Sequence, residues 1–194
     1  MGSLFDLERH YAFYGAYHSD PVNILIHTLL VWPIFFTSLL LYYFIPPFLV
    51  VAPAAAAPLV FNLGFAFAAL YAVFYVLLDP RAGSIAALLC ALCWVGSCIL
   101  GSHLGFSLAW KVVLAAQLLC WSGQFIGHGV FEGRAPALLD NLSQAFLMAP
   151  FFVLLEVLHR LFSYEPYPGF HASVQAKIEA EQKEWQASKQ KKSS

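Results

Sequence analysis

Four long apolar runs, separated by short polar or proline-rich links, dominate the pattern of hydrophobic and polar positions. They cover approximately residues 22–45, 59–78, 84–102 and 108–130. Each is close to the roughly 20 residues that a helix needs to cross the hydrocarbon core of a bilayer. None shows the alternation of apolar and polar residues that is typical of transmembrane barrel strands. The pattern therefore predicts four membrane-spanning helices.

The links contain residues that begin and end helices. Asp20-Pro21, before the first run, joins a good N-cap to a good first helical residue. Pro46-Pro47 closes the first run, and Asp79-Pro80 separates the second from the third. The stretches 53–58 and 103–107 are the other two links. We expect successive spans to cross the membrane in alternating directions.

A fifth apolar segment, residues 138–162, is interrupted by polar side chains and by Pro150. Because proline kinks or breaks a helix, we expect a broken, re-entrant hairpin that reverses at this residue. The alternative is a straight fifth span, which would carry Glu156 away from the end of the fourth run, whereas the hairpin would return it there. The predicted fold class is all-α, a polytopic membrane helix bundle with four full spans plus a broken or re-entrant fifth segment.

Two more polar stretches flank this bundle. Residues 1–20 have the pattern of a short amphipathic helix at the membrane interface. Residues 163–194 are a polar C-terminal tail. The domain organisation that we expect is therefore an N-terminal interfacial helix, a transmembrane domain over residues 21–162, and the tail.

Composition agrees with a membrane protein. Of the 194 residues, 60% are hydrophobic and 11% are charged, whereas soluble domains carry about 25% charged residues. Five of the ten basic residues lie within 177–192, so the positive-inside rule predicts a cytosolic C-terminal tail. The net charge is -1 and no basic face interleaves with aromatic residues, which gives nucleic-acid binding no support.

The end of the fourth apolar run carries the strongest chemical signal. His128 and Glu132 are four residues apart, so on an α-helix their side chains point the same way, one turn apart. An imidazole and a carboxylate together suit a divalent metal such as iron or zinc. Gly127 and Gly129 leave room for a close approach to the imidazole. We expect Pro136 to end the helix.

Two further histidines lie at the start of the first run. On a continuous helix, the nine-residue spacing of His18 and His27 is a rotation of about 900°, which puts them on opposite faces. The break at Asp20-Pro21 allows both to face one point. Four spans return the chain to the membrane face where it began, so His128 and Glu132 share that face with the first two histidines. We therefore expect these side chains to converge.

Each of these residues also has a structural interpretation. A histidine within a span can form an interhelical hydrogen bond, and His128 with Glu132 can form an ion pair. Asn23 and Asn141 can join neighbouring helices or orient metal ligands. Arg134 can close an ion pair or receive a substrate carboxylate. Convergence at one membrane face favours the metal site, because the structural interpretation does not explain it.

Three stretches together resemble the eukaryotic 2-hydroxy fatty acid dioxygenases of the endoplasmic reticulum. They are Phe13-Tyr14 with Tyr17-His18, Pro21, Asn23 and Ile26-His27; Gln124 to Glu132 with Arg134, Pro136-Ala137-Leu138 and Asp140-Asn141-Leu142; and Ala149-Pro150-Phe151 with Glu156. The block Gly-His-Gly-Val-Phe-Glu at 127–132 is the specific part. The middle spans are similar to the family only in character.

This resemblance implies an Fe²⁺-dependent α-oxidation. A long-chain 2-hydroxy fatty acid and O2 give CO2 and the fatty acid one carbon shorter, in phytosphingosine degradation. The essential histidines of the family fall on His18, His27 and His128, and Glu132 is carried as a candidate catalytic residue and fourth metal ligand. The candidates for substrate binding are Arg134, Asn23, Asn141 and Glu156.

The same resemblance implies a multi-pass enzyme of the endoplasmic reticulum membrane, with residues 21–162 as its catalytic domain. Apolar helices suit an acyl chain that lies between spans, in contact with membrane lipid. Two other functions stay open. One is a membrane zinc hydrolase of the amidase or ceramidase type, which uses a metal-activated water. The other is a non-enzymatic membrane scaffold, in which the histidines only pack helices.

Overall fold

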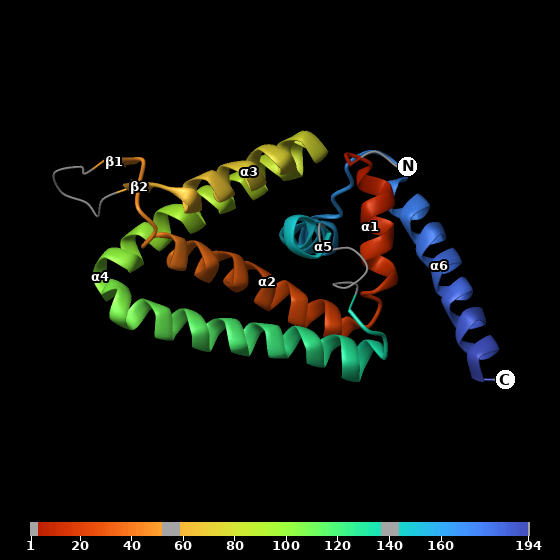
Figure 1. Ribbon diagram of the computed structural model, residues 1–194. Coiled ribbons are helices and arrows are strands. Elements are labelled where there is room, and N and C mark those ends of the chain that lie inside the picture. Colours follow the sequence, from red (N-terminus) through yellow and green to blue (C-terminus); the bar gives the residue numbers. More distant parts are fainter. Residues whose placement is uncertain (1–3, 52–58, 137–143, 194) are drawn as a thin grey trace.

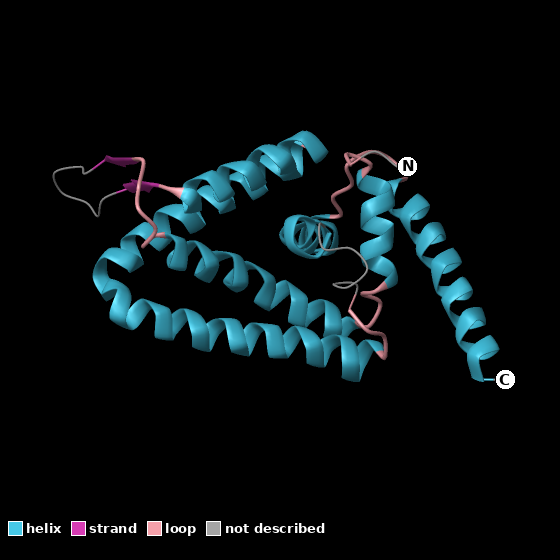
Figure 2. Ribbon diagram, in the orientation of Figure 1, coloured by secondary structure: helices cyan, strands magenta, loops and turns pink. Residues whose placement is uncertain are grey.

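The computed structural model describes residues 4–51, 59–136 and 144–193, and these are almost entirely helical (Figure 2). This confirms the predicted helical fold class. In chain order the elements are α1 (Leu7–Ala16), α2 (Pro21–Tyr42), β1 (Leu49–Val51), β2 (Leu59–Phe61), α3 (Leu63–Leu78), α4 (Pro80–Ile126), the π-helical turns η1 (Gly127–Glu132) and η3 (Gln144–Met148), α5 (Ala149–Phe162) and α6 (Phe170–Ser193).

Asp20-Pro21 begins a helix as predicted, and Asp79-Pro80, expected only to separate two apolar runs, begins one as well. The side chain of Asp20 accepts hydrogen bonds from the backbone N–H groups of Val22 and Asn23, and Pro21 is the first residue of α2. Asp79 caps α4 in the same way. An aspartate that binds the first free N–H groups of a helix fixes where the helix begins. The chain therefore breaks between His18 and His27, as the metal hypothesis requires.

Helix α4 folds back on itself in the middle. Its 47 residues would extend about 70 Å if straight, more than twice the roughly 30 Å of a bilayer core. Gly105 has φ 64° and ψ 163°, a conformation outside the helical region, and it lies within the predicted 103–107 link. Figure 1 shows the consequence: α4 turns sharply there, so its end returns to the start of α2.

The predicted number of spans is not confirmed. Within the described residues, two helices are long and apolar enough to cross a membrane, Pro21–Tyr42 and Pro80–Glu132. The second contains the break at Gly105 and so has two legs. Helix α3, with 16 residues, is shorter than a typical span.

A small hairpin replaces the first turn of the predicted second span. Residues 59–61 form β2, which pairs antiparallel with β1 in the register Val50↔Val60. Asn62 explains the late start of α3, because its side-chain oxygen accepts from the N–H of Gly64 while its amide donates to the carbonyls of Tyr43 and Ile45. An asparagine that binds nearby backbone competes with a continuing helix. The predicted 53–58 loop lies outside the described residues.

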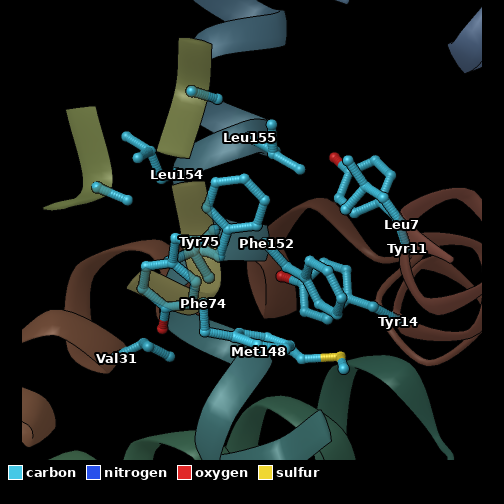
Figure 3. Packing of buried hydrophobic residues seen from close by; sticks show 14 of the residues in the cluster. Leu7, Tyr11, Tyr14, Val31, Phe74, Tyr75, Met148, Phe152, Leu154 and Leu155 are labelled. Carbon is cyan, nitrogen blue, oxygen red and sulfur yellow. The ribbon is translucent and has the colours of Figure 1, made fainter. Parts of the chain in front are cut away.

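The expected reversal at Pro150 is wrong. From residue 144 the chain is helical through η3 and α5, and Pro150 lies in the first turn of α5. The missing N–H of Pro150 leaves the carbonyl of Phe146, four residues earlier, without its helical donor, and this carbonyl accepts from the phenol of Tyr71 at 3.0 Å. The phenol of Tyr75 donates to the carbonyl of Leu147 at 2.8 Å, and its ring stacks on Phe151. Helix α5 thus enters the main core cluster, part of which is seen in Figure 3.

The C-terminal stretch, expected to be a polar tail, forms α6 and packs along α1 (Figure 1). Phe170 is fully buried, with its ring 5.7 Å from that of Tyr11. Glu8 of α1 accepts hydrogen bonds from Tyr167 and Ser173 and pairs with Lys177. As a result α1 lies between α5 and α6, and its C-terminal end is held beside the start of α2.

Candidate metal centre

The structure brings the three predicted histidines together. His18 lies in the link between α1 and α2, His27 in α2, and His128 in η1 at the end of α4. Their candidate ligand nitrogens all lie within 4.8 Å of one another. The ring of His18 is 4.3 Å from that of His27, and both are 4.8 Å from that of His128. Residues far apart in sequence therefore form one compact cluster.

No two of the three histidine rings stack. The three pairs of ring planes meet at 81°, 70° and 77°, and each ring contributes one nitrogen to the group of close ligand atoms. Nδ1 of His18 lies 2.8 Å from the Tyr14 carbonyl, and Nδ1 of His27 lies 2.9 Å from the Asn23 carbonyl. Histidines that bind metals usually donate one ring N–H to such an acceptor, which leaves the other nitrogen for the metal.

Two buried nitrogens support the fit of a metal ion. Nε2 of His18 and Nδ1 of His128 have no hydrogen-bond partner among the described residues. Burial and the neighbouring His27 and His128 imidazoles hold the pKa of His18 well below its usual value. The neutral imidazole is the form that binds a metal. The donor set fits a divalent ion such as iron or zinc, and imidazole alone does not choose between them.

Glycine at position 127 allows α4 to reach this site. A Cβ at Gly127 would lie 2.5 Å from Oδ1 of Asn23, so a larger residue would push η1 away from α2. A Cβ at Gly129 would meet no heavy atom of the described residues within 4 Å. Of the two glycines that were predicted to permit a close approach, Gly127 is therefore the one that is closely approached, and the approaching helix is α2.

Glu132 is not part of the histidine cluster. Its carboxylate accepts hydrogen bonds from the backbone N–H groups of Ser19 and Asp20 and from Nδ2 of Asn23, all at 3.0 Å. The local π-helical turn explains the difference, because its i→i+5 hydrogen bonds widen the turn and residues four apart no longer stack. The carboxylate instead ties the end of α4 to the positive N-terminal end of α2.

Pro136 does not end this helix. Helix η1 ends at Glu132, and Gly133 follows with a left-handed φ of 65°. A glycine in this conformation is the common C-cap of a helix, because it pays no steric penalty for positive φ. The prediction from Pro136 was wrong since the glycine three residues earlier already provides a stop signal.

An apolar cavity of about 380 Å³ extends from the three histidines. Its walls follow α2 from His27 to Tyr42, a distance of about 22 Å at the helical rise. Phe67 and Tyr71 of α3 and the second leg of α4 complete its far part. No Asp, Glu, Lys or Arg is among the described residues that line it. The cavity is thus polar at the histidine end and apolar beyond.

Three of the predicted substrate-binding residues, Arg134, Asn23 and Glu156, are not among the described residues that line this cavity. Arg134 donates to the Ala16 carbonyl at 2.8 Å, and its guanidinium lies 3.4 Å from the ring centre of Tyr17. The side chain of Asn23 donates to the Tyr17 carbonyl and to Glu132. Arg134 and Asn23 therefore hold the frame of the site.

Glu156 contributes to a second cavity, of about 610 Å³, and Asn141 lies outside the described residues. The carboxylate of Glu156 accepts from the phenol of Tyr11 at 2.9 Å and pairs with Arg160 at 2.6 Å. Tyr14 and His18 line both cavities and so separate Glu156 from the apolar one.

Sequence reasoning missed several polar residues that line the apolar cavity, among them Gln124 and Tyr14 beside the histidines. Their spacing was a usable signal. Gln124 precedes His128 by four residues and Tyr14 precedes His18 by four, which places each near its histidine when the backbone is helical.

Comparison with known proteins gives two matches over most of the chain. The family described as 2-hydroxy-palmitic acid dioxygenase Mpo1-like matches residues 4–161. A protein of Saccharomyces cerevisiae named 2-hydroxy-palmitic acid dioxygenase MPO1 is 32% identical over 176 residues, which cover 91% of this chain and 89% of the relative. No solved structure matches the chain.

Proposed function

We propose that this chain, which belongs to the 2-hydroxy-palmitic acid dioxygenase Mpo1-like family, is an Fe²⁺-dependent 2-hydroxy fatty acid dioxygenase of a membrane. In the proposed reaction, a 2-hydroxy fatty acid and O2 give the acid one carbon shorter, CO2 and water. The observation that carries the proposal is the cluster of His18, His27 and His128 at the polar end of an apolar cavity.

The three histidines would hold the metal. Iron(II) bound by imidazoles supplies redox chemistry with O2 and keeps coordination positions open. The carbonyls of Tyr14 and Asn23 fix the ring orientation of His18 and His27. Glu132 acts as a positioning residue, because it joins the turn that carries His128 to the segment between the other two histidines.

The apolar cavity would hold the acyl chain. Its length along α2, about 22 Å, exceeds the roughly 15 Å of one bilayer leaflet that an acyl chain fills. Its lining excludes water from the chain, and the histidines lie at one end only. A fatty acid bound this way places its carboxyl end and its 2-hydroxyl group next to the metal.

The outer surface supports a membrane location for the enzyme. Large apolar side chains on three helices are more than half exposed, among them Leu29 of α2, Leu70 of α3, and Leu92 and Leu119 of α4. Such surfaces are stable in lipid and are costly in water. We infer that α2, α3 and the two legs of α4 make four crossings of the endoplasmic reticulum membrane. The basic residues of α6 favour the cytosolic side for the C-terminus.

Turnover of a labelled substrate tests this function. Metal-free protein is loaded with Fe²⁺ or Zn²⁺ and given 2-hydroxypalmitate labelled at the carboxyl carbon, with and without O2 and without 2-oxoglutarate. We expect labelled CO2 and pentadecanoic acid only with Fe²⁺ and O2. Zinc-dependent hydrolysis of an amide lipid without O2 would identify a hydrolase instead. Unchanged metal content after His128→Ala would indicate a scaffold.

A further inference from the structure

Two buried hydrogen-bond donors beside the histidine cluster are unpaired. The amide nitrogen of Gln124 and the hydroxyl of Tyr14 have no hydrogen-bond partner within the described part of the chain. Both residues are only 7% exposed, and both line the apolar cavity. Leaving a buried donor unpaired costs free energy, so native proteins seldom keep two of them close to one site without a ligand.

Both donors flank the histidines. Gln124 lies one helical turn before His128, on the side of the cluster from which the cavity extends. The ring of Tyr14 stacks on that of His18, with ring centres 4.0 Å apart and planes 18° apart. The ring also contacts Phe152, beside which Figure 3 shows it. The two donors thus come from different helices, Gln124 from α4 and Tyr14 from α1.

The cavity offers a fatty acid no cation of the protein. No Lys or Arg is among its described lining residues, and Arg134 is occupied by the Ala16 carbonyl and the Tyr17 ring. A carboxylate that leaves water needs hydrogen-bond donors in return, and bonds to a charged acceptor are the stronger kind. Apart from the histidines, Gln124 and Tyr14 carry the buried unpaired donors among the described residues of the walls.

We propose that the Gln124 amide and the Tyr14 hydroxyl donate hydrogen bonds to the carboxylate of the bound fatty acid. The proposal rests on the function proposed above and assigns the acid-recognition subsite of that enzyme. The two donors orient the carboxyl end toward the histidines, and their loss weakens binding of an acid without weakening binding of the alkyl chain.

Gln117 provides a matched control on the same helix. It lies seven residues before Gln124 and lines the same cavity, but its amide is fully used. Nε2 donates to the Ile34 carbonyl at 3.0 Å and to Thr37 Oγ1 at 2.8 Å, and Oε1 accepts from the indole of Trp121 at 2.9 Å. Gln117 therefore joins α4 to α2, whereas the amide nitrogen of Gln124 has no hydrogen-bond partner among the described residues.

The test measures ligand binding in detergent on the full-length protein without added metal. Displacement of a fluorescent fatty acid gives the Kd for 2-hydroxypalmitate and for hexadecanol, which has the same chain length and no carboxylate. Gln124→Leu and Tyr14→Phe should each raise the Kd for the acid about tenfold and leave the Kd for the alcohol unchanged. Gln117→Leu should lower Tm and change the Kd values for the acid and the alcohol by the same factor, because it alters the wall of the cavity without removing an unpaired donor.

Equal losses for acid and alcohol, or no loss for either, would overturn the subsite. Iron content and Tm of the Gln124→Leu and Tyr14→Phe variants should match those of the wild type. The two proposals fail separately. If acid-selective loss occurs in a protein that shows no O2-dependent turnover, the subsite stands and the dioxygenase does not. If turnover is intact and Gln124→Leu binds the acid normally, the dioxygenase stands and the subsite does not.

Discussion

The molecule contains two histidine clusters with opposite geometry. In the first, the rings of His18, His27 and His128 stand nearly perpendicular to one another around one point. In the second, between α5 and α6, His159 and His171 stack with ring centres 3.4 Å apart and planes only 25° apart. Histidines that lie close together are therefore not sufficient for a metal site.

Ring orientation accounts for the difference. An imidazole nitrogen offers its lone pair in the plane of the ring, so two stacked rings direct their lone pairs along parallel lines that do not meet at one ion. Nε2 of His171 is also directed to the Tyr164 carbonyl at 3.2 Å. In the first cluster, one nitrogen of each ring lies within 4.8 Å of the others, and the carbonyls of Tyr14 and Asn23 hold the rings of His18 and His27 through their Nδ1 atoms.

Replacing one histidine in each cluster tests the comparison most strongly. His27→Ala should lower metal content below one ion per chain. It should reduce activity by more than about a hundredfold, which is more than the loss expected when a residue that only orients a metal ligand is replaced. His171→Ala should retain the metal content and the activity of the wild type. Plasma emission spectrometry and turnover of 2-hydroxypalmitate measure the two effects. A larger loss of metal from the His171 variant would reverse the assignment.

Removing the Glu132 carboxylate should loosen the first cluster alone. Glu132→Ala leaves the N–H groups of Ser19 and Asp20 without their acceptor, so we expect a stability loss of about 1–3 kcal/mol. Metal affinity should fall roughly tenfold to a hundredfold, because His18 and His128 lose their link. Denaturant unfolding and metal titration measure these losses. The matched Glu156→Gln variant, at the second cavity, should retain metal affinity.

The paired glycines give a finer probe of how closely α4 approaches α2. Gly127→Ala should cost about 1–3 kcal/mol, because its Cβ would overlap Oδ1 of Asn23 at 2.5 Å. Gly129→Ala has free space in the described structure and should be neutral or slightly stabilising, since alanine favours helices. Thermal unfolding of both variants gives the two Tm values, and we expect the lower one for Gly127→Ala. Equal Tm values would show that the approach is not tight.

The smallest effect should appear on acidification, at the contact between Glu8 of α1 and helix α6. Hydrogen bonds and the charge of Lys177 lower the pKa of Glu8 from 4.5 to about 2. A lowered pKa stabilises the folded state above pH 4.5, and this contribution is lost as the pH falls from 4.5 toward 2. Docking of α6 should weaken by at most about 1 kcal/mol. Lower protection factors for hydrogen exchange in α6 at pH 3 than at pH 6, each corrected for the intrinsic exchange rate at that pH, would show it.

Glu8→Gln should produce the same loosening of α6 already at pH 6 and remove most of the pH dependence. Metal content should stay at the wild-type level at pH 6, because Glu8 touches none of the three histidines. Protection of α6 that is identical in this variant and the wild type would contradict the role of Glu8.

Local rules made the helix starts and the histidine set predictable. Asp20-Pro21 is a capping signal within two residues, and the assumption that successive apolar runs reverse direction brings His128 back to the start of α2 without any knowledge of packing. The broken link around Gly105 follows from the same assumption. These features depend on short sequence patterns and on the thickness of a membrane, both of which can be read from residue order alone.

The remainder depends on contacts between distant residues. The role of Glu132 follows from a π-helical turn, which no sequence period distinguishes from an α-helical one. Packing of α6 on α1 rests on Phe170 and Val174, two apolar residues in a polar stretch. Gln124 and Gln117 have the same residue type and the same helix face, and only tertiary structure shows which one is paired.

The packing of α6 against α1 has a consequence for biosynthesis. Helix α1 finds this neighbour only after α6 has been synthesised, and His18 waits for His128 in the same way. Until the residues around His128 have emerged, the nascent polypeptide has two imidazoles without the third. Because His128 precedes α6, the three histidines can meet before α6 covers α1, so the site and the final packing can form at different times.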